Sequence, residues 1–165
     1  MIKDKLVKFI DDNNILPNQQ YGFRRDHNTT QPLIKIRKNV KANFELGKST
    51  GMVLLDIKSA FDSVWHNGLV FKMKRLNFPT ETIKIIQSFL CNRTFKVFIG
   101  SKCSQQITVT AGCPQGSCLS PILYNVFTAD IPSLQNCNTS IFAILFKYIH
   151  IYILSWHHYQ FTSSV

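Results

Sequence analysis

The sequence has 165 residues, of which 45% are hydrophobic and 17% are charged. This is an ordinary globular composition, which excludes a disordered or collagen-like protein, and the length is typical of one domain. Lys and Arg number 19 against 9 Asp and Glu, a formal net charge of +10, and 17 of the basic residues lie within residues 1–100. This charge favours a polyanionic partner such as nucleic acid, although an inert basic surface would have the same composition.

Metal, disulfide and membrane signals are weak. The five cysteines are odd in number and include no C-x-x-C pair, so neither a disulfide framework nor a zinc ribbon is indicated. The first residues lack the apolar segment of a signal peptide. The apolar stretch 141–154 contains Lys147 and His150 and is shorter than the roughly 20 apolar residues of a membrane-spanning helix. We expect no membrane association, and the stretch predicts either a buried strand pair or a disordered tail.

Apolar periodicity predicts the elements of the first half of the chain. Helices are expected over residues 1–12 and 31–46, with a loop at 13–20 between them. The run from Met52 to Leu55 is typical of a strand buried on both faces. A helical turn is expected after this strand, around 59–65, with Trp65 in the core.

The second half begins with a helix opened by Pro79 and Thr80, whose apolar stripe is Ile83, Ile86, Phe89 and Leu90. The period then changes to two, which predicts a hairpin formed by 94–99 and 107–110. A loop follows, and then a helix that starts at Ser120 as N-cap, continues through Pro121 and runs to about Asp130. Helices and strands interleave without a βα repeat, so the fold class is α+β.

Three short segments carry residues suited to nucleotide chemistry. Asp56 ends a predicted strand, where a carboxylate can hold a divalent cation or simply cap a helix. The loop 111–116 presents Gln115, whose amide could bind a nucleotide, or it is a plain connection. Arg24 and Arg25 precede a helix and could grip phosphates, or they belong to a solvated loop. Taken alone, each segment is explained equally well by its structural alternative: a helix cap, a plain connection or a solvated loop.

Taken together, the three segments resemble the reverse transcriptase domain of non-LTR retrotransposons, in particular the jockey-like group. That family reads Q-x-G-F-R, then L-D-I-x-x-A-F-D-x-V-W-H, then A-G-V-P-Q-G-S-x-L-S-P-x-L-Y-N. The corresponding segments here are 20–24, 55–66 and 111–125, in the same order and spacing. The resemblance covers residues 15–131.

The resemblance implies a partial right-hand polymerase of the α+β class with no thumb. The fingers would come from about 1–50 and 78–112, and the palm from about 51–77 and 113–155, with a divergent tail at 144–165. The implied partners are an RNA template, a DNA primer and deoxynucleotide triphosphates. No protein partner is implied, and the family acts in the cytoplasm and nucleus.

The family also implies roles for individual residues. Asp56 matches the catalytic carboxylate that binds Mg²⁺, where two Mg²⁺ ions align the primer and the triphosphate for nucleotidyl transfer. Phe61, Gln115 and Arg24 match nucleotide-binding residues, and Phe61 is the aromatic residue beneath the incoming sugar. Contacts with the template or its backbone are expected from Arg25 and Gly116. Asp62 is expected to order its turn.

The sequence departs from the family at the motif Y/F-A-D-D, which supplies two further carboxylates. Phe142 and Ala143 fit its start, but Ile144 and Leu145 stand where the two Asp residues belong, and residues 131–165 contain no Asp or Glu. We therefore expect a catalytically inactive polymerase domain, with a frame slip near codons 142–146. The alternative is a non-catalytic nucleic-acid-binding remnant.

Overall fold

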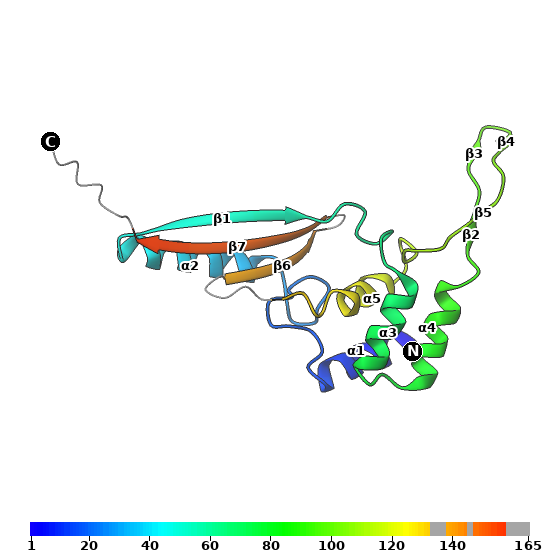
Figure 1. The fold of residues 1–165 in the computed structure, drawn as a ribbon, viewed down its shortest axis with the longest axis horizontal. Coiled ribbons are helices and arrows are strands. Elements are labelled where there is room, and N and C mark those ends of the chain that lie inside the picture. Colours follow the sequence, from blue (N-terminus) through cyan, green and yellow to red (C-terminus); the bar gives the residue numbers. More distant parts are fainter. Residues whose placement is uncertain (133–137, 145–146, 158–165) are drawn as a thin grey trace. The chain divides into compact units, whose positions relative to one another are not determined.

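The computed structural model describes residues 1–132, 138–144 and 147–157. These residues fold as two compact units, each built from two segments that are distant in the sequence (Figure 1). The helical unit comprises Met1–Pro17 and Ser59–Asp130, and the sheet unit comprises Asn18–Lys58 and Ile131–Val165. The predicted α+β class is confirmed, because both units together contain five helices and seven strands within the described ranges.

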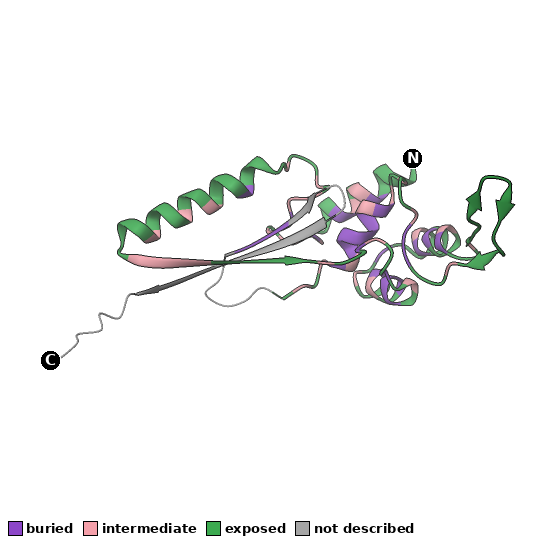
Figure 2. Cartoon of the chain, turned by 90° about the horizontal axis from the view of Figure 1, so that it is seen from above, coloured by how far each residue is buried: buried purple, intermediate pink, exposed green. Residues whose placement is uncertain are grey.

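The helical unit contains four helices around one apolar core. They are α1 (Ile2–Asp12), α3 (His66–Arg75), α4 (Thr80–Leu90) and α5 (Ser120–Phe127). All four helices contribute to the buried residues that Figure 2 shows in purple, and the largest fully buried apolar side chains are Tyr124, Leu6, Leu69, Met73, Ile86, Leu90 and Leu123. The predicted helices at 1–12 and from Thr80 are confirmed, because their apolar stripes face this core.

Helix α3 is an element that the sequence did not predict. Its N-cap is Trp65, which makes no side-chain capping hydrogen bond, and Gly68 lies within its first turn. Both features lower the local helix signal, so packing against α4 and α5 stabilises α3 instead. The expectation that Trp65 lies in the core is wrong: the side chain is 62% exposed, and its ring covers Gly68, where a Cβ would lie 2.5 Å from a ring carbon.

Helix α5 begins differently from the prediction. Leu119 is the N-cap, and the Ser120 hydroxyl donates to the carbonyl of Pro114 at 2.6 Å instead of capping the helix. The prediction of Ser120 as N-cap is therefore wrong, because the preceding loop offers its hydroxyl a carbonyl acceptor. Pro121 does occupy the first turn, as expected.

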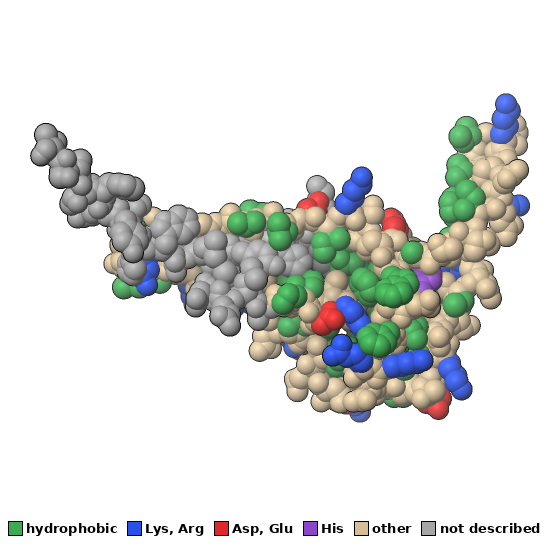
Figure 3. All heavy atoms as spheres, in the orientation of Figure 1, with side chains coloured by type: hydrophobic (Ala, Val, Ile, Leu, Met, Phe, Trp, Pro, Cys, Tyr) green, Lys and Arg blue, Asp and Glu red, His purple; other side chains and the backbone are tan. Residues whose placement is uncertain are grey.

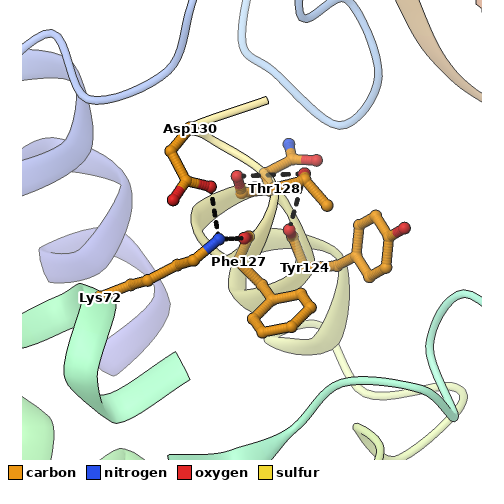
Figure 4. Close-up of polar contacts among 6 residues, drawn as sticks. Lys72, Tyr124, Phe127, Thr128 and Asp130 are labelled. Atoms are coloured by element: carbon orange, nitrogen blue, oxygen red, sulfur yellow. Dashed lines mark hydrogen bonds and ion pairs between the residues drawn. The ribbon is translucent and has the colours of Figure 1, made fainter. Parts of the chain in front are cut away.

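The C-terminal end of α5 is held by a lysine from α3 (Figure 4). The Lys72 ammonium donates to the carbonyl of Phe127 and to the Asp130 carboxylate, and it lies 4.8 Å from the centre of the Phe127 ring. A cation placed there compensates the unpaired carbonyls at a helix C-terminus. Helix α5 ends at Phe127, three residues before the predicted end.

The predicted hairpin is present and consists of two short ladders. Strand β2 (Thr94–Phe95) pairs with β5 (Ile107–Thr108), and β3 (Phe98–Ile99) pairs with β4 (Lys102–Cys103), both antiparallel. The hairpin belongs to the helical unit; its first strand, β2, follows α4, and β5 leads on towards α5 (Figure 1).

The sheet unit contains a three-stranded antiparallel sheet and one helix. Strands β1 (Lys48–Asp56), β7 (Lys147–His157) and β6 (Asn138–Ile144) lie in that order, and α2 (Thr30–Glu45) lies against β1. The predicted helix at 31–46 is confirmed, and the stretch 141–154 contributes to a strand pair. Within the described ranges no helix is both long and apolar enough to cross a membrane. Residues 158–165 of the predicted tail lie outside the described part.

The expectation that β1 is buried on both faces is wrong. Each side chain from Met52 to Leu55 is about half exposed, and the apolar side chains of α2 at Leu33, Val40 and Phe44 are exposed as well. An apolar run determines that a strand forms, but burial needs a covering layer on each face. β1 lies at the edge of the sheet, and the described part of the chain does not cover its side chains fully.

Candidate functional site

Residues 59–66 of the second family segment are joined to the third segment in the helical unit. The N–H of Ser63 donates to the carbonyl of Ser59 at 2.9 Å, which closes the predicted helical turn. The loop that carries Gln115 packs against this turn: the N–H of Cys113 donates to the carbonyl of Phe61, and that of Gly112 to the carbonyl of Val64, both at 2.8 Å. Backbone hydrogen bonds therefore hold the two segments in one arrangement.

Gly112 makes this close approach possible. Its φ of +87° lies in the left-handed region, and a Cβ at this position would lie 2.8 Å from Cα and 2.9 Å from the carbonyl oxygen of Asp62. Any other residue would clash with the backbone and strain its own. Gly116, at φ +83°, has open space where its Cβ would lie, so its glycine serves the turn alone.

The Asp62 carboxylate accepts the amide of Gln115. The Gln115 Nε2 atom lies 3.1 Å from Oδ1 and 3.3 Å from Oδ2, and both side chains are exposed. This contact sets the position of the Gln115 side chain. The sequence led us to expect that Asp62 orders its own turn, and the contact that the structure shows instead connects that turn to the Gln115 loop.

The carbonyl of Gly112 accepts two further side chains that the sequence reasoning missed. His66 Nε2 lies 2.8 Å from this oxygen, and the Arg93 guanidinium donates to it as well as to the carbonyl of Leu90. His66 could have been noticed because it ends the second family segment. Arg93 gave no local signal, since it reaches the loop from the end of α4.

Two ionisable groups of the site lie in the core. Burial raises the pKa of the Cys113 thiol from 9.0 to about 11, although the nearby Arg93 acts in the opposite direction. Burial also raises the pKa of Tyr124 to about 12. The Tyr124 ring packs against the ring of Phe61, with centroids 5.6 Å apart and planes at 59°. The Phe61 ring is thus supported by an aromatic contact with a side chain of α5.

In the sheet unit, Asp56 is the last residue of β1. It pairs with Ile149 of β7, which in turn pairs with Phe142 of β6. The paired ends of β6 and β7 are Ile144 and Lys147, so they lie at the same end of the sheet as Asp56. Leu145 lies outside the described residues. The register therefore places Phe142, at the start of the family's carboxylate motif, level with Asp56 but on the far side of β7.

The segment that carries Arg24 and Arg25 is attached to β6. The N–H of Tyr21 donates to the carbonyl of Ile141 at 3.0 Å, and the N–H of Ile141 donates to the carbonyl of Gln19 at 2.8 Å. Arg24 is half-buried, whereas Arg25 is exposed and its Nε lies 3.9 Å from the Asp26 carboxylate.

A capping box fixes the end of this loop at α2. Asn28 Oδ1 accepts the N–H groups of Thr30 and Gln31, both at 3.0 Å, and Gln31 Oε1 accepts the N–H of Asn28 at 3.2 Å. This reciprocal pattern satisfies donors that a helix N-terminus otherwise leaves unpaired. The spacing N-x-x-Q was readable in the sequence, and it would have indicated the start of the helix.

The predicted site residues thus fall into two groups. Phe61, Gln115 and Gly116 lie together in the helical unit, while Asp56, Arg24 and Arg25 belong to the sheet unit. In the described ranges, no three His, Cys, Asp or Glu side chains gather as a possible metal-binding group.

Comparison with known proteins identifies the family. The family model for reverse transcriptase (RNA-dependent DNA polymerase) matches residues 1–152. The chain is 38% identical over 132 residues to a probable RNA-directed DNA polymerase from transposon BS of Drosophila melanogaster. The aligned region covers 80% of this chain and 14% of the relative. The chain is also 38% identical over 133 residues to the RNA-directed DNA polymerase from mobile element jockey of Drosophila melanogaster, covering 81% of this chain and 14% of the relative.

The corresponding jockey polymerase of Drosophila funebris is 40% identical over 126 residues, which is 76% of this chain and again 14% of the relative. The chain therefore spans about one seventh of the length of these relatives. The family match includes residues 132–152, beyond the range of the three segments noted in the sequence. On this match the chain belongs to the reverse transcriptase (RNA-dependent DNA polymerase) family, and its similar relatives include RNA-directed DNA polymerases from the mobile element jockey.

Proposed function

We propose that this chain is a reverse transcriptase domain of a non-LTR retrotransposon that does not itself perform nucleotidyl transfer. The observation that carries the proposal is the register of the sheet unit together with its sequence. Asp56 lies at the same end of the sheet as the Ile144–Lys147 pair, and in the sequence Ile144 and Leu145 occupy the positions expected to hold two more carboxylates.

The remaining residues do not fit the pair of Mg²⁺ ions that the family uses. Two adjacent divalent cations need several anionic oxygens to offset their repulsion, and such ions would activate the primer oxygen and stabilise the triphosphate charge. Residues 131–165 supply no Asp or Glu. Asp62 already accepts the amide of Gln115, and Asp130 already accepts Lys72. The single carboxylate of Asp56 does not supply enough anionic oxygens to hold two Mg²⁺ ions.

The nucleotide-binding parts of the proposal concern the other family positions. Phe61, supported by Tyr124, would carry the sugar of a nucleotide, and Gln115 would lie near the base pair. Arg24 would face a triphosphate or the template. Contacts with the nucleic-acid backbone would come from Arg25 and from the open turn at Gly116. The division into fingers and palm and the location in cytoplasm or nucleus belong to the same proposal.

Primer extension tests the proposed loss of catalysis. The chain would be incubated with an RNA template, an annealed DNA primer, deoxynucleotide triphosphates and Mg²⁺, beside an active retroviral enzyme as positive control. We expect no extended primer from the wild type or from Asp56→Asn. Mg²⁺-dependent extension by the wild type that disappears in Asp56→Asn would refute the proposal.

Nucleic-acid binding without catalysis is the second candidate function. The observation that favours it is the concentration of 17 basic residues within residues 1–100, which include the Arg24 loop, α2 and α3. Binding of this kind releases counterions, so its affinity falls steeply as salt rises. Fluorescence anisotropy with a labelled RNA–DNA hybrid should show this dependence, and no binding even at low salt would exclude the function.

A further inference from the structure

The hairpin of the helical unit exposes an unusual set of side chains. Every residue from Thr94 to Thr108 is exposed, including large apolar residues, with Phe98 at 70% and Ile99 at 77%. Figure 3 shows hydrophobic side chains along one edge of the hairpin. The exposed large apolar residues are Phe95, Val97, Phe98, Ile99 and Ile107.

The hairpin has a defined conformation despite this exposure. The N–H of Ser104 donates to the carbonyl of Val97 at 2.9 Å, which continues the register of the β3–β4 ladder. The register of the β2–β5 ladder differs from it by one residue. Between the two ladders, the N–H of Val97 donates to the Ser104 hydroxyl at 2.9 Å, so a side chain holds this part of the hairpin as well. The Gln106 amide donates to the Thr94 hydroxyl at 3.1 Å and fixes the base.

The charged side chains of this hairpin are all basic. No Asp or Glu occurs between Glu81 and Asp130, while the hairpin itself carries Lys96 and Lys102. Neither lysine forms an ion pair with any described residue. Arg93 at the base donates to the carbonyls of Leu90 and Gly112, so it anchors the hairpin to the Gln115 loop.

We propose that this hairpin binds single-stranded nucleic acid. Phe98 and Phe95 would stack on bases, and Lys96 and Lys102 would contact phosphates, which is the combination that proteins use on unpaired strands. The proposal rests on the nucleic-acid binding proposed above and names one surface responsible for it. An apolar edge could also enter a groove of a protein, but the uncompensated positive charge beside the aromatic rings favours a polyanion.

Two variants of the full chain separate stacking from charge. The probe is a fluorescein-labelled oligouridylate, which has little structure of its own, with anisotropy measured over a salt series. We expect Phe98→Ala to weaken binding about 10-fold at every salt concentration, since each stacked base contributes an affinity of this order. The logarithm of the association constant falls as the logarithm of the salt concentration rises. We expect the double variant Lys96→Gln, Lys102→Gln to make this slope shallower by about 1.4, because each phosphate contact on a single strand contributes about 0.7.

Phe71→Ala is the matched control, because Phe71 is a 59% exposed phenylalanine on α3 of the same unit. It should leave affinity and slope unchanged. If the wild type binds but both hairpin variants bind with its affinity and slope, the hairpin assignment is overturned while nucleic-acid binding by the chain stands, and a protein partner becomes the better explanation. If the wild type does not bind at low salt, the underlying function itself is lost.

Discussion

The apolar residues of the helical unit and those of β1 and α2 in the sheet unit differ in burial. Within residues 1–132 and 139–141, every buried apolar side chain apart from Pro32 and Ile141 belongs to the helical unit. In the sheet unit, the apolar run of β1 and the apolar side of α2 remain largely exposed (Figure 2). Equally clear apolar patterns in the sequence are therefore buried in the helical unit but exposed in β1 and α2 of the sheet unit. A pattern specifies an element, whereas burial depends on what covers it.

The largest difference between the units should appear in core truncations. Leu123 of α5 is fully buried, and Leu54 of β1 is about half exposed. We expect Leu123→Ala to reduce the free energy of unfolding by about 2–5 kcal/mol, because it removes packed atoms and leaves a cavity. Leu54→Ala should cost less than about 1 kcal/mol. Urea denaturation followed by circular dichroism measures both, and equal losses would contradict the contrast.

A smaller effect should come from the glycine that joins the two family segments. Gly112 and Gly116 both have positive φ, but only Gly112 faces the Asp62 backbone. Gly112→Ala should destabilise the protein by about 1–3 kcal/mol from the strained backbone alone, with the clash added to it. Gly116→Ala lacks that clash and is the matched control. Thermal melts of the two variants that coincide would show that the close approach is unimportant.

The lysine at the end of α5 should contribute less. Lys72→Met removes the donor to the Phe127 carbonyl and to Asp130, and we expect a loss of about 1–2 kcal/mol. Asp130→Asn should cost about 0–1 kcal/mol, because the carboxylate is largely exposed and solvent screens the pair. Denaturation at low and high salt measures both variants. A greater loss from Asp130→Asn than from Lys72→Met would show that the ion pair outweighs the cap.

The smallest effect concerns thiol chemistry in the core. With its pKa raised to about 11, Cys113 has about 100-fold less thiolate near neutral pH than a thiol at 9.0, and it is buried as well. Alkylation followed by peptide mapping should find Cys91, Cys103 and Cys118 modified before Cys113. Modification of Cys113 at their rate would contradict its burial.

The same thiol predicts how stability depends on pH. Because the folded pKa is raised, the contribution of Cys113 is fully present below pH 9 and is lost as pH rises from 9 to about 11, since the unfolded chain releases its proton first. Tyr124, with a pKa of about 12, adds a loss of the same sign above pH 10. A Cys113→Ala variant should lose the first part of this decline, measured as the change in melting temperature relative to neutral pH.

Local sequence was enough for most elements and for the family segments. The helices α1, α2 and α4 and the hairpin followed from periodicity, and the order of the three segments led to the correct family. Helix α3 was missed because Trp65 supplies no cap and Gly68 weakens its first turn. The predicted cap at Ser120 failed because the hydroxyl found the Pro114 carbonyl, a contact that no local pattern shows.

The sequence by itself determined the basic charge, the family segments and the absence of Asp and Glu from residues 131–165, because these are properties of composition and order. Only the tertiary structure decided that Gly112 packs on Asp62, that Asp62 holds Gln115, and that Arg93 and His66 share one carbonyl. Three of these contacts join residues more than 40 positions apart, and the fourth spans 19. Such contacts depend on how helices and loops pack, which periodicity along the chain does not encode.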